Sequence, residues 1–123
     1  DKIIRKGSVK SYVRKKFILP FNPAAGLLIC EGKSNPEWNF SAPHGAGRIL
    51  SRSEAKRTIT EDMAKESMKN VFSTLIPVDE NPLVYKDPVV IEKCIEPTAI
   101  ILDRIIPIHN MKANDIPSFK LKK

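Results

Sequence analysis

The sequence predicts a single mixed α+β domain that is built from short elements. Short apolar runs typical of strands occur at residues 17–20, 26–30 and 99–108, whereas helix-start signals occur at Thr58 and Asp87. Ten prolines interrupt the 123 residues, which favours many short elements over a few long ones. No regular alternation of strand and helix demands a doubly wound parallel sheet.

The first part of the chain is expected to consist of strands and loops. Pro43, Gly45 and Gly47 break up residues 41–47, so we expect neither regular helix nor strand there. Strand-like runs are predicted at residues 2–13, 17–20 and 26–30, and turns or loops at residues 6–8, 21–23 and 31–36.

The helices are expected in the second part. A helical pattern begins at Ile49, and the spacing of Thr58 and Glu61 predicts a capping box for a second helix. Asp87 as N-cap and Pro88 at the first helical position predict a third helix. Strands are expected at residues 72–78 and 99–108, and a polar tail at 114–123. The predicted inward-facing residues are Met63, Ala64, Ser67 and Met68, then Val90, Ile91, Cys94 and Ile95.

The composition describes a soluble globular domain with an excess of positive charge. Hydrophobic residues make up 41% and charged residues 28%, and no run approaches the roughly 20 apolar residues of a membrane helix. The formal net charge of +7 favours an anionic partner. The cations cluster in residues 1–16, in residues 48–57 and in the tail (Lys120, Lys122 and Lys123), where they are interpreted as a solvated face.

Cysteine and histidine usage gives no metal motif. Two cysteines and two histidines leave no four-ligand zinc site and no disulfide framework. Cys30, Cys94 and His109 lie at no recognisable metal spacing and are assigned to structure.

Residues 39–52 carry the chemical signal. Gly45 and Gly47 permit a tight turn whose N–H groups could form an anion-binding nest, and a helix starting near residue 48 or 49 would direct its positive end there. Arg48 and Arg52 can each bind phosphate oxygens through two N–H groups, and four-residue spacing would place them with Lys56 on one helix face. His44 could bind, transfer protons or attack phosphorus. An ordinary turn with a packed or capping histidine remains the alternative.

The motifs resemble the RtcB family of GTP-dependent RNA-splicing ligases. The run Ser-Ala-Pro-His-Gly-Ala-Gly-Arg at residues 41–48, followed by Ser51 and Arg52, looks like the family signature. The same order of landmarks continues in Ile-Arg-Lys-Gly at 4–7, Leu-Pro at 19–20, Tyr-Lys-Asp at 85–87 and the Pro-to-Lys-Ala ending at 107–113. Residues 1–113 therefore resemble the C-terminal part of an RtcB-like ligase domain and its α+β fold.

The resemblance implies an enzyme that joins RNA 2′,3′-cyclic phosphate or 3′-phosphate ends to 5′-hydroxyl ends with GTP and manganese. It implies that His44 takes GMP covalently. The implied partners are RNA ends, tRNA-like or damaged, and the implied location is cytoplasmic, with no membrane partner. By the same resemblance, Lys6, Gly45, Ala46, Gly47, Tyr85 and Lys112 bind the nucleotide, and Arg48 and Arg52 bind RNA phosphate.

The sequence departs from the family pattern at two places, which concern nucleotide binding and metal binding. The family's Gly-Ser-Met-Gly loop is replaced by residues 21–26, where Asn22 could supply a polar group. No motif of the family's metal ligands is present, so no metal ligand is assigned to this chain. Manganese is expected to be held by an upstream portion of the same protein or by a separate chain. A non-catalytic fragment or paralogue that binds RNA or nucleotide is the alternative function.

Overall fold

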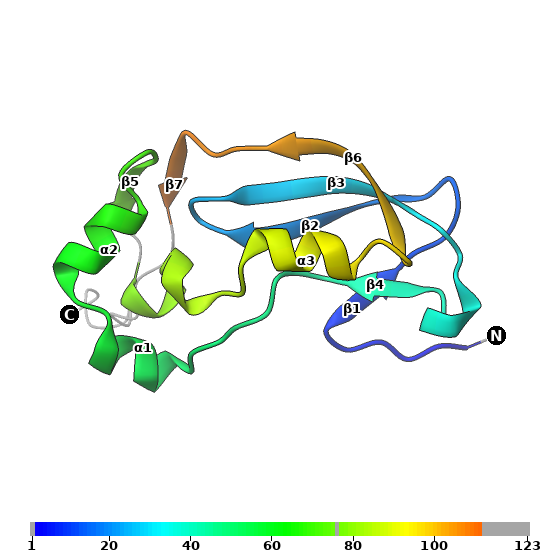
Figure 1. Ribbon diagram of the computed structural model, residues 1–123, viewed down its shortest axis with the longest axis horizontal. Helices are drawn as coiled ribbons and strands as arrows, with labels where there is room; N and C mark the ends of the chain where they lie inside the picture. Colours follow the sequence, from blue (N-terminus) through cyan, green and yellow to red (C-terminus); the bar gives the residue numbers. More distant parts are fainter. Residues whose placement is uncertain (1, 76, 112–123) are drawn as a thin grey trace, which may run out of the picture.

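A three-stranded antiparallel sheet with one helix packed on it forms the centre of the computed structural model, which describes residues 2–75 and 77–111 (Figure 1). The sheet has the order β2-β3-β6, from Lys16–Asn22, Gly26–Gly32 and Ala99–Ile105. The helix is α3, Pro88–Cys94. The mixed α+β class is confirmed. Lys112 and the predicted tail at 114–123 lie outside the described residues.

The central sheet forms because its strands alternate between buried and exposed residues. Leu19 and Phe21 of β2 and Leu28 and Cys30 of β3 are buried, and Ile91 and Ile95 of the α3 segment complete the same core. Hairpin β2–β3 turns at residues 23–25, later than the turn predicted at 21–23, because Phe21 and Asn22 still belong to β2. Strand β6 pairs with β3 from Leu27↔Ile105 to Gly32↔Ala99. The predicted strand at 99–108 is therefore confirmed but ends at Ile105.

A second ladder pairs the first strand with the segment that leads to His44. Strand β1, Ser8–Lys10, pairs antiparallel with β4, Ser41–Pro43. The prediction that residues 41–47 contain no strand was therefore wrong at its start. Pro43 is tolerated because it is the last residue of β4 in a sheet of only two strands. Of the predicted strand at 2–13, only β1 is regular.

The two short helices of the second part begin later than predicted. Helix α1 spans Arg52–Thr58, and its capping box is formed by Ser51 and Glu54 rather than by Thr58 and Glu61. Helix α2 spans Glu61–Ser67, and the Thr60 side chain accepts a hydrogen bond from the N–H of Met63. Helix α1 begins late because the N–H groups of Ile49 and Leu50 donate to the carbonyl of Val84. It ends at Thr58, since the backbone of Ile59 is extended there and its side chain packs with Ala55 and Val84.

The remaining elements are short. Strand β5, Phe72–Leu75, pairs in parallel with β7, His109–Met111, so the predicted strand at 72–78 ends early. Single 3-10 turns η1, η2 and η3 span Pro36–Trp38, Val78–Glu80 and Pro82–Val84. None of the helices in residues 2–75 and 77–111 has the length and apolar character that a membrane span requires.

Three residues predicted to face inward do not. Met63 and Val90 are exposed, and so is Cys94, whereas Met68, Ile91 and Ile95 are buried. The start of α3 is confirmed, since the Asp87 side chain accepts from the N–H of Val89 and Pro88 is the first helical residue. Helix α3 is two turns long, so only its Ile91–Ile95 face reaches the sheet.

Candidate functional site

A cavity of about 590 Å³ lies where the β2–β3 hairpin, the segment after β4 and Tyr85 meet. The rest of its wall comes from the hairpin turn, from Glu80, from Ile105 at the end of β6 and from Pro107 after that strand. Six of the residues predicted for the site line it: His44, Gly45, Ala46, Gly47, Arg48 and Tyr85.

Backbone hydrogen bonds connect the turn at residues 45–47 to β2 on one side and to the segment before α3 on the other. The N–H of Ala46 donates to the carbonyl of Pro20 in β2 at 3.1 Å, and the N–H of Lys86 donates to the carbonyl of Gly47 at 3.0 Å. Gly47 has φ of 77°, a left-handed conformation that favours glycine. These bonds hold the turn in the cavity wall without help from a helix, because α1 begins only at Arg52.

Arg48 is the cation inside the site. Its Nε donates to the carbonyl of Leu50 at 3.0 Å, and its guanidinium carbon lies 5.4 Å from the centre of the Tyr85 ring. Its Nη2 is buried and has no hydrogen-bond partner in the part of the chain that the structure describes. An unsatisfied buried donor is costly, and a phosphate oxygen would satisfy it. The residues present therefore fit a bound nucleotide phosphate.

Tyr85 is held by a carboxylate that the sequence reasoning missed. Its hydroxyl donates to Oε2 of Glu80 at 2.5 Å, and Glu80 also lines the cavity. Burial raises the pKa of Tyr85 above its ordinary value, and the bond to Glu80 raises it further. Tyr85 is therefore a neutral hydrogen-bond donor at physiological pH. The pairing joins residues only five apart, but no sequence pattern singled out Glu80.

Arg52 lies outside the lining of the cavity and contacts it through Glu80. Arg48 precedes α1, so the predicted shared helix face for Arg48, Arg52 and Lys56 is not formed. Nη1 of Arg52 donates instead to Oδ2 of Asp79 and to Oε1 of Glu80, both at 2.9 Å, and Arg52 does not line the cavity. These bonds raise the pKa of Arg52 and hold that of the buried Asp79 below its usual value.

His44 is exposed on the cavity wall, directly after β4. Its backbone N–H donates to the carbonyl of Gly7 at 3.4 Å, which fixes its backbone beside the start of β1. No group within residues 2–75 and 77–111 bonds to its imidazole ring. His44 thus lines the cavity with a ring that makes no hydrogen bond to the described residues.

Three further residues were predicted to contribute to the site: Lys6, Lys112 and Asn22. Lys6 is exposed next to Gly7 but does not line the cavity, and Lys112 lies outside the described residues. Asn22 lines the cavity, but its Oδ1 accepts from the N–H groups of Ala24 and Ala25 at 2.9 and 2.8 Å. Its carbonyl oxygen therefore stabilises the hairpin turn.

Lys86 is a second cation near the turn that the sequence reasoning missed. A Cβ placed on Gly47 would lie 3.7 Å from Nζ of Lys86, so the ammonium lies beside the glycine backbone. The signal that could have found it is its position directly after Tyr85 in the Tyr-Lys-Asp step.

The described residues do not offer a manganese site. They contain no cluster of three or more histidine, cysteine, aspartate or glutamate side chains that could hold a metal ion. Cys30 is buried in the core, where burial raises the pKa of its thiol, and Cys94 is exposed on α3. His109 is exposed in β7, with its ring stacked on Phe72 at 5.0 Å between centroids.

A cavity with a glycine turn, a half-buried arginine on a tyrosine and an exposed histidine defines a candidate phosphate- or nucleotide-binding site. A family model described as tRNA-splicing ligase RtcB matches residues 2–113, so the chain belongs to the RtcB family.

Curated relatives of the chain carry the same family name. "RNA-splicing ligase RtcB" of Escherichia coli (strain K12) is 31% identical over 87 residues, which are 69% of this chain and 21% of the relative. "tRNA-splicing ligase RtcB" of Aeropyrum pernix is 35% identical over 83 residues, which are 61% of this chain and 17% of the relative. The chain thus spans about a fifth of the length of these relatives.

Proposed function

We propose that this chain is the guanylate-accepting, C-terminal part of an RNA ligase that joins RNA 2′,3′-cyclic phosphate or 3′-phosphate ends to 5′-hydroxyl ends. The observation that carries the proposal is the cavity that gathers His44, the turn at residues 45–47, Arg48 and Tyr85. Membership of the RtcB family and the RNA ligase names of its relatives support the choice of reaction.

The first chemical step takes place on His44. An unprotonated ring nitrogen attacks the α-phosphorus of GTP, a nitrogen–phosphorus bond forms, and the bond from that phosphorus to the bridging oxygen breaks. Pyrophosphate leaves with the bonding electrons, and GMP stays on His44. The exposed ring and the absence of a bond to it among the described residues are compatible with a nucleophile that turns toward a bound nucleotide.

The next steps transfer GMP to RNA. An oxygen of the RNA 3′-phosphate attacks the phosphorus of GMP and displaces His44, and the RNA 5′-hydroxyl then attacks the activated RNA phosphate and releases GMP. A 2′,3′-cyclic end first takes up water and opens to the 3′-phosphate. Arg48 offsets the phosphate charge through its buried Nη2 donor, with Lys86 as a second cation beside the turn.

Manganese is proposed to be supplied with its ligands by another portion of the protein or by another chain. A metal ion of this kind would neutralise the triphosphate. No cluster of metal ligands is found in the described residues, and the mechanism above uses only groups of this chain.

The proposal is tested by covalent labelling. The chain is incubated with GTP labelled on the α-phosphorus and with manganese, with and without the upstream part of a relative such as the Escherichia coli ligase. It is then denatured in acid and in base. A phosphoramidate is labile in acid and stable in base, so we expect an acid-labile label that disappears in His44→Ala.

His109→Ala is the matched control, since the chain has two histidines and His109 is exposed outside the cavity. It should label like the parent chain. Equal labelling of His44→Ala and the parent would refute His44 as the acceptor. Absence of label in every combination, together with retained nucleotide or RNA binding, would instead support a non-catalytic binding protein.

A further inference from the structure

The turn between β1 and β2 presents a cluster of cations outside the His44 cavity. Residues 10–16, called the basic turn below, include Lys10, Arg14, Lys15 and Lys16, and all four side chains are exposed. Lys10, Lys15 and Lys16 line a second, open cavity of about 610 Å³, together with Tyr12 and Phe17.

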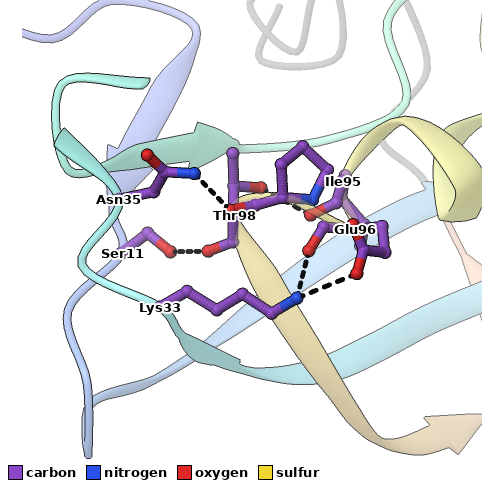
Figure 2. Close-up of polar contacts among 7 residues, drawn as sticks. Ser11, Lys33, Asn35, Ile95, Glu96 and Thr98 are labelled. Atoms are coloured by element: carbon purple, nitrogen blue, oxygen red, sulfur yellow. Dashed lines mark hydrogen bonds and ion pairs between the residues drawn. The ribbon is translucent and has the colours of Figure 1, made fainter. Parts of the chain in front are cut away.

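A buried hydrogen bond of Ser11 anchors the basic turn. Ser11 is 1% exposed, and its hydroxyl donates to the carbonyl of Thr98, whose own hydroxyl donates to the carbonyl of Ile95 (Figure 2). In the same network, the amide of Asn35 donates to the carbonyl of Pro97 at 2.8 Å, and Lys33 bonds to Glu96. The network ties the turn to the end of α3.

The backbone of the turn is bonded at several further points. The N–H of Lys15 donates to the carbonyl of Tyr12 at 3.0 Å, and that of Ser34 donates to the carbonyl of Ser11 at 2.9 Å. Arg14 has φ of 67°, a left-handed conformation that a non-glycine residue adopts at a cost. These backbone hydrogen bonds and the fixed conformation of Arg14 are not expected of a flexible loop, so the basic turn is preorganised.

The cations of the turn are not neutralised by close ion pairs within the described chain, although Glu31 lies opposite Lys16 in the β2–β3 register. None of Lys10, Arg14, Lys15 and Lys16 forms an ion pair with a carboxylate of residues 2–75 or 77–111. By contrast, Lys65 and Lys69 on and after α2 pair with Glu61 and Glu66. Four unpaired cations on a fixed backbone repel one another and are stabilised by an external polyanion.

The β1–β4 ladder connects the turn to the cavity. The N–H of His44 bonds to Gly7 at one end, and Lys10 pairs with Ser41 at the other, three residues further along. Three steps of a strand amount to roughly 10 Å. In Figure 1 the same ladder runs between the segment after β4 and the loop that leads into β2.

We propose that the basic turn binds the phosphate backbone of the RNA strand whose 3′ end lies in the His44 cavity. The placement of that end rests on the proposed function; the binding of RNA by the turn does not. Lysine and arginine bind phosphates without regard to base sequence, so this subsite would bind backbone phosphates a few nucleotides away from the 3′ end.

The test compares two triple variants of the chain with the same net charge. One carries Lys10→Ala, Lys15→Ala and Lys16→Ala; the control carries Lys65→Ala, Lys69→Ala and Lys93→Ala, at exposed lysines of other elements. The probe is a fluorescent octauridylate with a 3′-phosphate, and its affinity is measured from low to moderate salt. Uridine 3′-phosphate, which is too short to span both places, serves as the second probe.

We expect the basic-turn variant to bind octauridylate at least tenfold more weakly than the control variant near 0.1 M salt. The slope of log K against log salt should fall by about 2, which corresponds to about 0.7 for each of three phosphates. Equal affinities and slopes of the two variants would overturn the proposal. An equal loss for uridine 3′-phosphate would overturn the spanning arrangement.

A competition experiment distinguishes RNA from acidic protein as the ligand of the turn, and the His44 labelling distinguishes failure of the ligase mechanism from failure of RNA binding. If polyglutamate displaces octauridylate as well as unlabelled RNA does, the turn is a surface for acidic protein and the proposal fails. If the His44 labelling fails while the salt-dependent loss at the basic turn is observed, the proposed ligase mechanism fails and RNA binding by the turn stands.

Discussion

The guanidinium carbon of Arg48 lies 5.4 Å from the centre of the Tyr85 ring, and the two residues also pair through an antiparallel backbone bridge. This relationship joins the glycine turn to the segment that leads into α3. The cation lies against the face of the aromatic ring, where the attraction is favourable. Glu80 accepts from the Tyr85 hydroxyl and thereby fixes the ring on which Arg48 rests.

Replacement of Arg48 tests its role in phosphate binding. We expect Arg48→Ala to weaken GTP binding by about 1.5 to 3 kcal/mol, because it removes a charge-assisted bond to phosphate. Isothermal titration calorimetry measures the change. Arg57→Ala, at an exposed position of α1, is the control of equal charge and should bind GTP as the parent does. Arg48 would be excluded from the site if both variants bound GTP equally well.

The buried carboxylate of Asp79 gives a prediction about acid stability. The hydrogen bond from Arg52 holds the pKa of Asp79 below its usual value near 3.9. The stabilisation is therefore complete above the pKa of the unfolded chain and is lost as the pH falls through the lower folded pKa. We expect Asp79→Asn to be less stable than the parent at pH 7 and the difference to shrink below pH 4.

Urea unfolding at pH 7, 5 and 3 measures this change for Asp79→Asn. Asp103→Asn, at an exposed position of β6, is the control and should show a much smaller loss at pH 7. A stability difference that stays constant from pH 7 to pH 3 would show that ionisation of Asp79 is not the cause.

Local signals predicted the parts of the fold that depend on neighbouring residues. The Asp87–Pro88 start of α3 needs only residues 87–89, and the β2–β3 hairpin needs two apolar runs around one turn. The glycine turn and His44 were likewise predicted from one continuous segment, and the structure places them in one cavity.

Side-chain partners that lie far apart in the sequence could not be predicted from such local signals. Arg52 pairs with Asp79, 27 residues away, because packing of α1 beside η2 brings them together. The sequence shows three cations at four-residue spacing and cannot show that a buried carboxylate binds the middle one. Glu80 was missed because its importance comes from two contacts together, one with Tyr85 five residues away and one with Arg52, 28 residues away.

The corrected start of α2 predicts which threonine stabilises it. The Thr60 side chain caps α2 by accepting from the N–H of Met63 at 3.2 Å, whereas the Thr58 hydroxyl donates to the carbonyl of Glu54 within α1. Thr60→Ala should reduce the free energy of unfolding by about 1 kcal/mol. Thr58→Ala should change it by less than about 0.5 kcal/mol, because alanine is the better helix former. Chemical denaturation measures both, and a larger loss for Thr58→Ala would restore the capping box at Thr58.

Gly26 begins β3 beside the cavity, and we expect its replacement by alanine to cost more stability than the same replacement at Gly7. Both have positive φ, of 84° and 74°, so alanine at either position incurs backbone strain of about 1 to 2 kcal/mol. At Gly26 a Cβ would also lie 2.0 Å from the carbonyl oxygen of Ile105 in β6, whereas at Gly7 it would meet nothing within 4 Å. The backbone of β6 would have to move, at an added cost of about 1 to 3 kcal/mol.

We therefore expect Gly26→Ala to lose clearly more stability than Gly7→Ala in urea unfolding. Gly26 lines the cavity, so Gly26→Ala should also weaken GTP binding, while Gly7→Ala retains most of it. Equal losses of stability in the two variants would mean that β6 yields without cost. In that case Ile105 at the end of β6 and Pro107 after it would form a compliant wall of the site rather than a rigid one.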